Sequence, residues 1–170
     1  IINNNKNDPV LEFAYQGPTL KYFGKKRNIV ITGDVNFSIS NKTDIKDNCE
    51  CYKAIQINDG DTINILSTNK SVYGYFSVTG GFKLNKVWNS YSTTSRALVG
   101  PNNGCKLLNG QEIMLNKSNL SSSRKVNYIN SKIEFIRVIK GTNIDHFSKQ
   151  SVKNFFEKSF IVTKLTDRMG

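Results

Sequence analysis

Apolar and polar residues alternate in short stretches along the first half of the chain, as in strands that are buried on one face. Each stretch carries β-branched or aromatic residues and is bounded by Gly, Asn or Asp, which is the composition of strands and their turns. Strands are predicted in this way at residues 10–15, 28–32, 35–40, 52–57, 61–66 and 72–78. Shorter candidates follow at residues 112–116, 132–139 and 160–165.

Local signals mark one turn and one helix. The sequence Asn58-Asp59-Gly60-Asp61 separates two alternating stretches and predicts a hairpin in which the glycine takes a positive φ. Later in the chain Ser148 can cap a helix, and Phe147 and Val152 occupy the two positions of a hydrophobic staple. The helix is expected to end near Lys158. Many strands with few helices predict a mainly β fold, a barrel or a sandwich with one or two short helices.

Length and composition favour one folded domain. The chain has 170 residues, of which 38% are apolar, and this is enough for one hydrophobic core. No window approaches the about 18 apolar residues of a membrane span, and no signal-peptide pattern opens the sequence. We therefore expect a single domain over residues 1–170 in a cytoplasmic protein that does not bind membranes.

The net charge of +11 first suggests nucleic acid as a partner. Lys, Asn and Ile are over-used throughout, however, as in proteins from AT-rich genomes, and the lysines are scattered rather than arranged in a stripe. The densest run, Lys25-Lys26-Arg27, lies between two predicted strands, where a solvated turn explains it. The sequence therefore predicts no nucleic-acid partner. Because lysine is so common, each of the five arginines is a more specific choice, and Arg96, Arg137 and Arg168 stand out.

Three cysteines and one histidine limit the redox and metal chemistry. Cys49 and Cys51 are separated by one residue and Cys105 stands by itself, so no disulfide framework is predicted. With His146 as the single histidine, a zinc site would lack ligands, and no metal is expected. His146 follows Asp145, which can orient an imidazole, but no Ser or Cys nucleophile stands beside the pair, and a structural role is the simpler interpretation.

Gly80-Gly81 opens the part of the chain in which unusual residue types gather. The diglycine follows directly on a predicted strand. Two glycines at a strand exit let a ligand approach the backbone closely and can direct amide N–H groups towards a developing negative charge. The alternative is a tight turn with no role in binding, which composition by itself favours.

A run of hydroxyl side chains follows, from Ser90 through Ser92 and Thr93 to Arg96. Hydroxyl groups offer adaptable hydrogen-bond donors, and a guanidinium can clamp a carboxylate or phosphate with two parallel bonds. The alternative is a Ser/Thr-rich turn that caps a short helix over residues 95–99. Both interpretations stay open at this point.

Six short motifs occur together in one order along nearly the whole chain. They are Gly17-Pro18-Thr19-Leu20, Thr32-Gly33-Asp34, Gly80-Gly81-Phe82, Ser90-Tyr91-Ser92-Thr93 with Arg96, Gly104 with Gly110, and Asp167-Arg168-Met169-Gly170. In this order and spacing they resemble the allophanate hydrolase subunit 2 family. That family is also called the biotin-dependent carboxyltransferase A/B subdomain, and it includes the C subunit of 5-oxoprolinase and the KipI antagonists.

The resemblance implies a cyclophilin-like β-barrel and a second, KipI-like subunit 1 as partner. It further implies a subunit of a hydrolase or carboxyltransferase complex, of the ATP-dependent 5-oxoprolinase or urea amidolyase type. The substrate would be a small amide, lactam or urea-type molecule, and ATP or carboxybiotin would enter through the complex rather than bind this chain directly. Arg96, Asp167 and Arg168 then become the candidate catalytic residues, and Gly80, Gly81, Ser90, Ser92 and Thr93 the candidate substrate-binding residues.

The same family leaves a second role open, that of a non-catalytic regulatory or binding module of the KipI-antagonist type. This role predicts tight partner binding that survives the substitution Arg96→Ala, and no turnover of any amide. Family members continue past residues 167–170 and begin with a segment that precedes Ile1. We therefore expect a piece of a longer protein that is inactive by itself.

Overall fold

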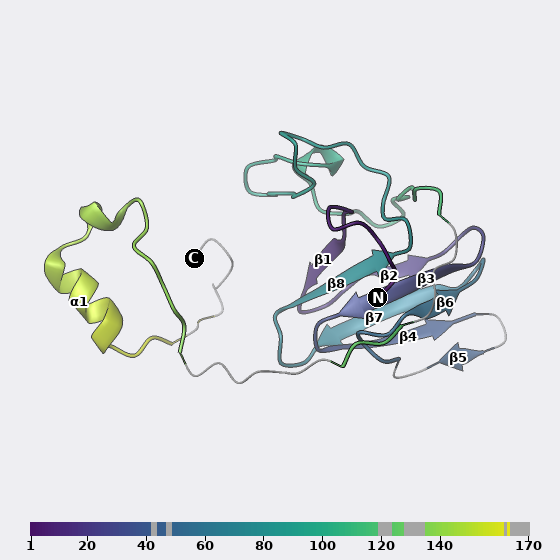
Figure 1. Ribbon diagram of the computed structural model, residues 1–170, viewed down its shortest axis with the longest axis horizontal. Helices are drawn as coiled ribbons and strands as arrows, with labels where there is room; N and C mark the ends of the chain where they lie inside the picture. Colours follow the sequence, from purple (N-terminus) through teal and green to yellow (C-terminus); the bar gives the residue numbers. More distant parts are fainter. Residues whose placement is uncertain (42–43, 47–48, 119–123, 128–134, 162, 164–170) are drawn as a thin grey trace. The chain divides into compact units, whose positions relative to one another are not determined.

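Eight strands form two four-stranded antiparallel sheets among the residues that the structure describes (Figure 1). The structure is a computed structural model, and it describes residues 1–41, 44–46, 49–118, 124–127, 135–161 and 163. The strands are β1 (Leu11–Ala14), β2 (Thr19–Lys21), β3 (Arg27–Thr32), β4 (Val35–Ser40), β5 (Ile45–Lys46), β6 (Ile55–Ile57), β7 (Thr62–Thr68) and β8 (Tyr73–Val78). The first sheet has the order β1-β8-β3-β6, and the second has the order β2-β7-β4-β5.

Alternating side chains of the two sheets fill a common hydrophobic core. Ile31 of β3, Phe37 of β4 and Ile63 and Ile65 of β7 are each only 1% exposed. Burying an aliphatic or aromatic side chain to this degree stabilises the fold by about 2 kcal/mol. In β4 the residues between the buried ones, such as Asn36, are more exposed, as the alternation in the sequence predicts.

The alternating pattern located six of the strands. β1, β3, β4, β7 and β8 lie within one or two residues of the predicted ranges, and β6 covers the second half of its predicted stretch. The pattern missed β2 and β5, because strands of three and two residues are too short to show a period. The class predicted from the sequence, mainly β, is confirmed.

Three predicted strands have a different outcome. Residues 112–116 form no strand, although Leu115 makes a single bridge to Phe82. Within 132–139 and 160–165, the described residues are not in strands either. The rest of those two ranges lies outside the described residues.

The turn at residues 58–61 is correctly predicted, but the hairpin is not. The Asp61 N–H donates to the Asn58 carbonyl oxygen over 3.1 Å, and Gly60 has a φ of 83°. The strands on either side, β6 and β7, belong to different sheets. The turn therefore carries the chain from one sheet to the other, since burial of both strands in one core outweighs local pairing.

No strand pairing joins the two sheets in the part of the chain that the structure describes, so the closed cyclophilin-like barrel stays a prediction. The chain also divides into two compact units, Ile1–Ile129 and Asn130–Gly170. Both sheets belong to the first unit, and the expected single domain over residues 1–170 stays a prediction.

The second unit contains the predicted helix, α1 (Lys149–Glu157). The Ser148 hydroxyl accepts a hydrogen bond from the Ser151 N–H over 3.1 Å, which is the predicted N-terminal cap. The helix ends before Lys158, also as predicted. Two 3₁₀ turns, η1 (Asn102–Gly104) and η2 (Ile144–His146), complete the helical elements of the described residues. None of these helices is long and apolar enough to cross a membrane.

Candidate site at the Gly80 turn

The chain leaves β8 through a four-residue turn, residues 78–81, which we call the Gly80 turn. The Gly81 N–H donates to the Val78 carbonyl oxygen over 2.9 Å and closes the turn. Gly80 and Gly81 have φ angles of 87° and 71°. A residue with a side chain is destabilised by about 1–2 kcal/mol in this left-handed region, so the backbone conformation of the turn favours glycine at both positions. The tight turn expected as one alternative is therefore present.

The side chain of Arg27, the first residue of β3, donates hydrogen bonds to this turn and to Asn116. Its Nη1 donates to the carbonyl oxygen of Thr79, and its Nη2 donates to that of Asn116, both over 2.7 Å. The solvated turn predicted for the basic run is therefore wrong for Arg27, which is half-buried. The physical reason is that a guanidinium can satisfy two carbonyl oxygens at once, whereas a lysine ammonium has no such planar fork.

Asn116 brings a later part of the chain back to the same turn. Its side-chain amide donates to the carbonyl oxygens of Gly80 over 3.0 Å and of Phe82 over 3.1 Å. Its backbone N–H donates to the Gly81 carbonyl oxygen over 3.2 Å. The Lys83 N–H also bonds to the Met114 carbonyl oxygen. The intervening residues 83–114, which we call the outer loop, therefore leave and rejoin the fold at one place.

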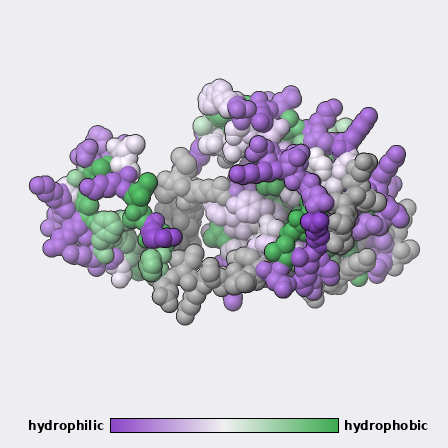
Figure 2. Space-filling model, viewed as in Figure 1, coloured by the Kyte–Doolittle hydropathy of each residue, from purple (hydrophilic) through white to green (hydrophobic). Residues whose placement is uncertain are grey.

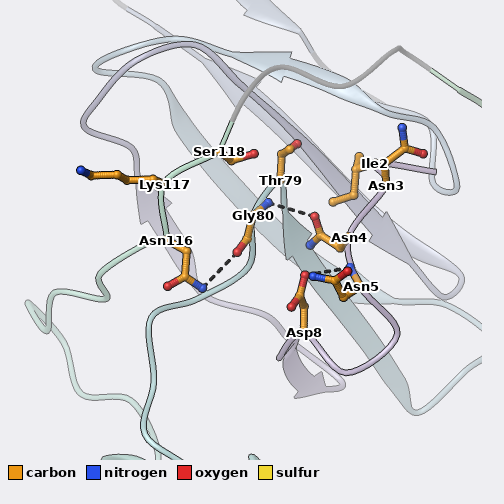
Figure 3. Close-up of a pocket in the computed structure, with 10 residues that line it drawn as sticks. All are labelled: Ile2, Asn3, Asn4, Asn5, Asp8, Thr79, Gly80, Asn116, Lys117 and Ser118. Atoms are coloured by element: carbon orange, nitrogen blue, oxygen red, sulfur yellow. Dashed lines mark hydrogen bonds between the residues drawn. The ribbon is translucent and has the colours of Figure 1, made fainter.

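The N-terminal segment, residues 2–9, crosses the Gly80 turn as a strap. The Asn4 side chain accepts a hydrogen bond from the Gly80 N–H over 2.9 Å (Figure 3). It also donates one to the Val78 carbonyl oxygen over 2.8 Å. Ile2 is buried, with 4% of its surface exposed. The strap is thus packed into the fold and bonded to the backbone of the turn.

A cavity of about 370 Å³ lies between the strap and the turn (Figure 3). Its lining comes mainly from residues with neutral amide and hydroxyl groups, together with Asp8 and with Lys117, whose Nζ points away from the turn (Figure 3). Such a lining suits a small polar molecule that offers both N–H and C=O groups. It does not suit ATP, because its lining includes one lysine and one aspartate and so offers no net positive charge to a triphosphate.

The candidate residues of the hydroxyl run lie elsewhere, in the outer loop. Ser90, Ser92, Thr93 and Arg96 are all exposed, and none of them lines the cavity. The Ser92 N–H donates to the Ser90 hydroxyl over 3.1 Å, and the Thr93 hydroxyl donates to the Pro101 carbonyl oxygen over 3.3 Å. Their role as substrate or catalytic groups stays a prediction, as does that of Gly80 and Gly81.

The short helix suggested for residues 95–99 is absent. The Thr94 N–H donates to the Val99 carbonyl oxygen over 2.8 Å, and the residues between them form a turn. Gly100 and Gly104 lie directly against this part of the loop: a Cβ atom on Gly104 would stand 2.0 Å from the Leu98 carbonyl carbon. Close backbone packing, rather than helix capping, therefore decides the loop's conformation.

The remaining candidates do not form a second site. Asp167 and Arg168 lie outside the described residues. Asp145 and His146 are both in η2, on its exposed surface. Within the described ranges, no group of three or more His, Cys, Asp or Glu side chains could hold a metal ion.

The motif Thr32-Gly33-Asp34 has a structural role. Gly33 has a φ of 110°, and its N–H donates to the Tyr52 hydroxyl over 3.0 Å. The Asp34 carboxylate accepts hydrogen bonds from the Asn69 side chain over 3.1 Å and from the Lys70 N–H over 3.2 Å. These bonds hold the pKa of Asp34 below its usual value. The motif thus ties the β3–β4 junction to the residues that follow β7.

Three residues that build the site, Asn4, Arg27 and Asn116, were not predicted from the sequence. Two are asparagines in a chain that is full of them, and their partners lie 74 to 76 and 34 to 36 residues away, beyond any local pattern. Arg27 carried a usable signal, because arginines are scarce here. Its place in a basic run concealed that signal.

The chain is similar to known proteins over its whole length. It matches the family described as carboxyltransferase domain, subdomain A and B, over residues 1–170. It is 26% identical to the C subunit of the 5-oxoprolinase of Haemophilus influenzae, over 100% of this chain and 53% of that protein. It is 25% identical to urea amidolyase of Saccharomyces cerevisiae, over 100% of this chain and 10% of that protein.

Solved structures agree with the sequence match. The urea amidolyase of K. lactis aligns with a TM-score of 0.72 at 20% identity, over 98% of this chain and 11% of that one. The urea carboxylase of Kluyveromyces lactis aligns with a TM-score of 0.62 at 25% identity, over 74% of this chain and 11% of that one. The chain thus spans about half the length of one curated relative and a smaller share of the others. Because the family match covers every residue, the chain belongs to the carboxyltransferase domain, subdomain A and B, family.

Proposed function

We propose that this chain is part of a subunit of an amide-processing enzyme complex, of the ATP-dependent 5-oxoprolinase or urea amidolyase type. Family membership and the names of the relatives support this class. In the proposal, the cavity at the Gly80 turn contributes one wall of a site that is shared with a partner subunit. The observation that carries the proposal is the turn itself, where two glycines of positive φ bring backbone groups to a polar cavity.

The chemistry of the cavity suits the substrate class. An amide, lactam or urea has a planar, resonance-stabilised group whose carbonyl oxygen must be polarised and whose N–H groups must be held. The turn has a backbone N–H at Gly80, which Asn4 occupies in this structure and a substrate would take over. Lys117 lines the cavity, and we expect its flexible side chain, which points away from the turn in Figure 3, to turn towards a substrate carboxylate. The turn holds the Gly80 N–H in place, so once a substrate has bound there this group needs no further reorganisation when the reaction occurs, which lowers the barrier.

The partner supplies the rest of the proposed site. The outer loop carries Ser90, Ser92, Thr93 and Arg96, which are exposed and do not line the cavity, and we expect them to bind substrate or partner once the complex forms. In the full-length protein we expect a closed cyclophilin-like barrel and a KipI-like subunit 1 as partner. ATP, or a carboxyl group carried by biotin, reaches the substrate through that partner.

The proposal is tested on the full-length protein purified together with its partner subunit. ATP-dependent release of glutamate from 5-oxoproline is expected, and Lys117→Ala should lower kcat/KM about tenfold, since it removes one charged hydrogen bond. Lys106→Ala is the matched control, because Lys106 is an exposed lysine of the outer loop that does not line the cavity. It should leave kcat/KM unchanged.

Three other outcomes decide between the two types of enzyme, the regulatory role and the position of the site. Urea-dependent turnover in place of glutamate release replaces the 5-oxoprolinase version with the urea amidolyase version. Tight partner binding that survives Arg96→Ala, with no turnover of any amide, supports the regulatory role instead. Equal losses in Lys117→Ala and Lys106→Ala contradict the placement of the site at the cavity.

A further inference from the structure

A side-chain amide of the protein itself is bound at the Gly80 turn. The side-chain carbonyl oxygen of Asn4 faces the Gly80 N–H at 2.9 Å (Figure 3). The Asn4 NH₂ group faces the Val78 carbonyl oxygen at 2.8 Å. One donor and one acceptor of the backbone thus bind the two ends of the same carboxamide. This is a paired contact, which fixes the orientation of the amide as well as its position.

The other polar groups of the turn have partners within the fold. The Thr79 N–H donates to the Asn28 carbonyl oxygen, and the Gly81 N–H donates to that of Val78. The carbonyl oxygens of Thr79 and Gly80 accept from Arg27 and Asn116. Of the three N–H groups from Thr79 to Gly81, that of Gly80 is the one whose partner is the strap.

The contact recognises one particular edge of an amide. In the NH₂ group of asparagine, one N–H lies on the same side as the carbonyl oxygen, so a single edge presents a donor and an acceptor side by side. Ureas, primary amides and lactams have the same edge. A secondary amide in its usual trans form has its N–H and C=O on opposite sides, and so it cannot bind both groups of the turn.

We infer that the Val78 carbonyl and the Gly80 N–H form a receptor for the cis edge of an amide, and that Asn4 occupies this receptor as an internal competitor. The inference rests on the proposed function in that it concerns the same cavity. It adds the geometric rule by which ligands are selected, and the residue that a ligand must displace.

The strap allows this exchange without unfolding. Ile2 is buried in a small cluster with Val30 and Ala54, and Pro9 is also buried. Both ends of the strap are therefore anchored, while Asn4 between them is only partly buried. Rotation about the Asn4 side-chain bonds frees the receptor, and the cavity beside it accepts the incoming ligand.

The test follows the backbone amide signals of the ¹⁵N-labelled chain by NMR as a small amide is added. 2-Pyrrolidone has the cis edge, N-methyl-2-pyrrolidone lacks the N–H, and N-methylacetamide has the trans arrangement. We expect 2-pyrrolidone to shift the Gly80 signal in a saturable manner, and the two methylated probes to leave it in place. Equal shifts with N-methylacetamide, or no saturable shift with 2-pyrrolidone, would overturn the inference.

The competitor is tested by substitution. Asn4→Ala should bind 2-pyrrolidone about tenfold more tightly than the unchanged chain, because the ligand no longer has to displace an occupant. Asn7→Ala is the matched control, since Asn7 is an exposed asparagine of the same strap that does not line the cavity. It should leave the affinity unchanged.

A second variant keeps the test informative if Asn4→Ala does not fold. Asn4→Asp keeps an acceptor for the Gly80 N–H but has no donor for Val78, so it should raise the affinity by a smaller factor. Unchanged affinity in folded Asn4→Ala and Asn4→Asp would contradict the competitor. Binding of 2-pyrrolidone without turnover in the complex would leave the inference standing and refute the proposed function. Turnover of substrate by the complex, together with unchanged 2-pyrrolidone affinity in Asn4→Ala and Asn4→Asp, would support the proposed function and refute the inference.

Discussion

The Gly80 turn and the outer loop follow each other in the chain, and both combine glycines with polar residues, yet they are held in opposite ways. The turn is bonded to Asn4, Arg27 and Asn116, whose partners lie 34 to 76 residues away in the sequence. The outer loop, which presents a mixture of hydrophilic and more hydrophobic residues on the face seen in Figure 2, is bonded mainly to itself. The Thr94 N–H donates to the Val99 carbonyl oxygen, and the Gly104 N–H donates to that of Gly100. Similar composition therefore conceals two different kinds of structure.

The difference predicts how substitutions in each region affect the stability of the protein. A turn whose partners come from three parts of the fold unfolds only with the fold, so its bonds contribute to global stability. A loop that bonds to itself can open locally while the sheets persist. Substitutions in the turn, in the outer loop and at the β3–β4 junction test this distinction, taken from the largest expected effect to the smallest.

Arg27→Ala should lower the free energy of unfolding by about 3 kcal/mol, because it leaves two carbonyl oxygens without their charged donor. Arg27→Lys should recover less than half of this loss, since an ammonium group cannot bind both oxygens in the same planar geometry. Urea denaturation measures both values. Arg96→Ala, in the outer loop, is the control and should cost less than about 0.5 kcal/mol. Equal costs for Arg27→Ala and Arg96→Ala would abolish the distinction.

Gly80→Ala should lower the free energy of unfolding by about 2 kcal/mol. Alanine is strained at the positive φ of this position, and its Cβ atom would stand 2.6 Å from Ser118 Cβ. Gly110→Ala isolates the backbone contribution. Its φ is 77°, but a Cβ atom there would meet nothing within 4 Å, so we expect about 1 kcal/mol. Thermal or urea unfolding of the two variants measures the difference in their free energies of unfolding. A larger loss of stability in Gly110→Ala than in Gly80→Ala would contradict the steric contribution assigned to Gly80.

Gly104→Ala should disrupt the outer loop and spare the sheets. The new Cβ would stand 2.0 Å from the Leu98 carbonyl carbon, so the loop must rearrange. Hydrogen exchange should show faster exchange at the Thr94 and Cys105 amides, while the free energy of global unfolding falls by less than about 0.5 kcal/mol. A global loss as large as that of Arg27→Ala would show that the loop is part of the cooperative fold.

Acid should affect the β3–β4 junction more than the Gly80 turn, because the side chains that hold the turn, those of Asn4, Arg27 and Asn116, include no carboxylate. Because the pKa of Asp34 is lowered in the folded protein, its carboxylate stabilises the fold at pH values above its unfolded pKa, about 3.9. This contribution is lost as the pH falls through the folded pKa. Asp34→Asn should therefore flatten the acid side of the stability profile, by less than about 0.5 kcal/mol because the group is near solvent.

The fold was predictable from the sequence where the deciding interactions are local. Alternation located six strands, and Ser148 marked the start of α1, because each depends on neighbours within a few residues. The pairing of β6 was not predictable, because two strands on either side of a good turn signal can still join different sheets.

The site was predictable only in part. The diglycine was found, because glycine adopts a positive φ without the steric cost that other residues carry, and so it marks tight turns. Arg27 and Asn4 were not found, since a side chain that bonds to distant backbone carbonyls leaves no pattern of spacing. The outer loop shows the converse: its hydroxyl groups form a clear pattern, but they do not line the cavity.

The bond from Arg27 to Asn116 also fixes when the site can form during synthesis. While the ribosome is still making residues 80–110, Arg27 and the strap are already available, but the second carbonyl oxygen and the Asn116 amide are not. Non-local contacts of this kind form late, after the segment that carries them has emerged. A nascent chain stalled before residue 116 should therefore contain its sheets but not its cavity, so binding competence comes after folding of the core.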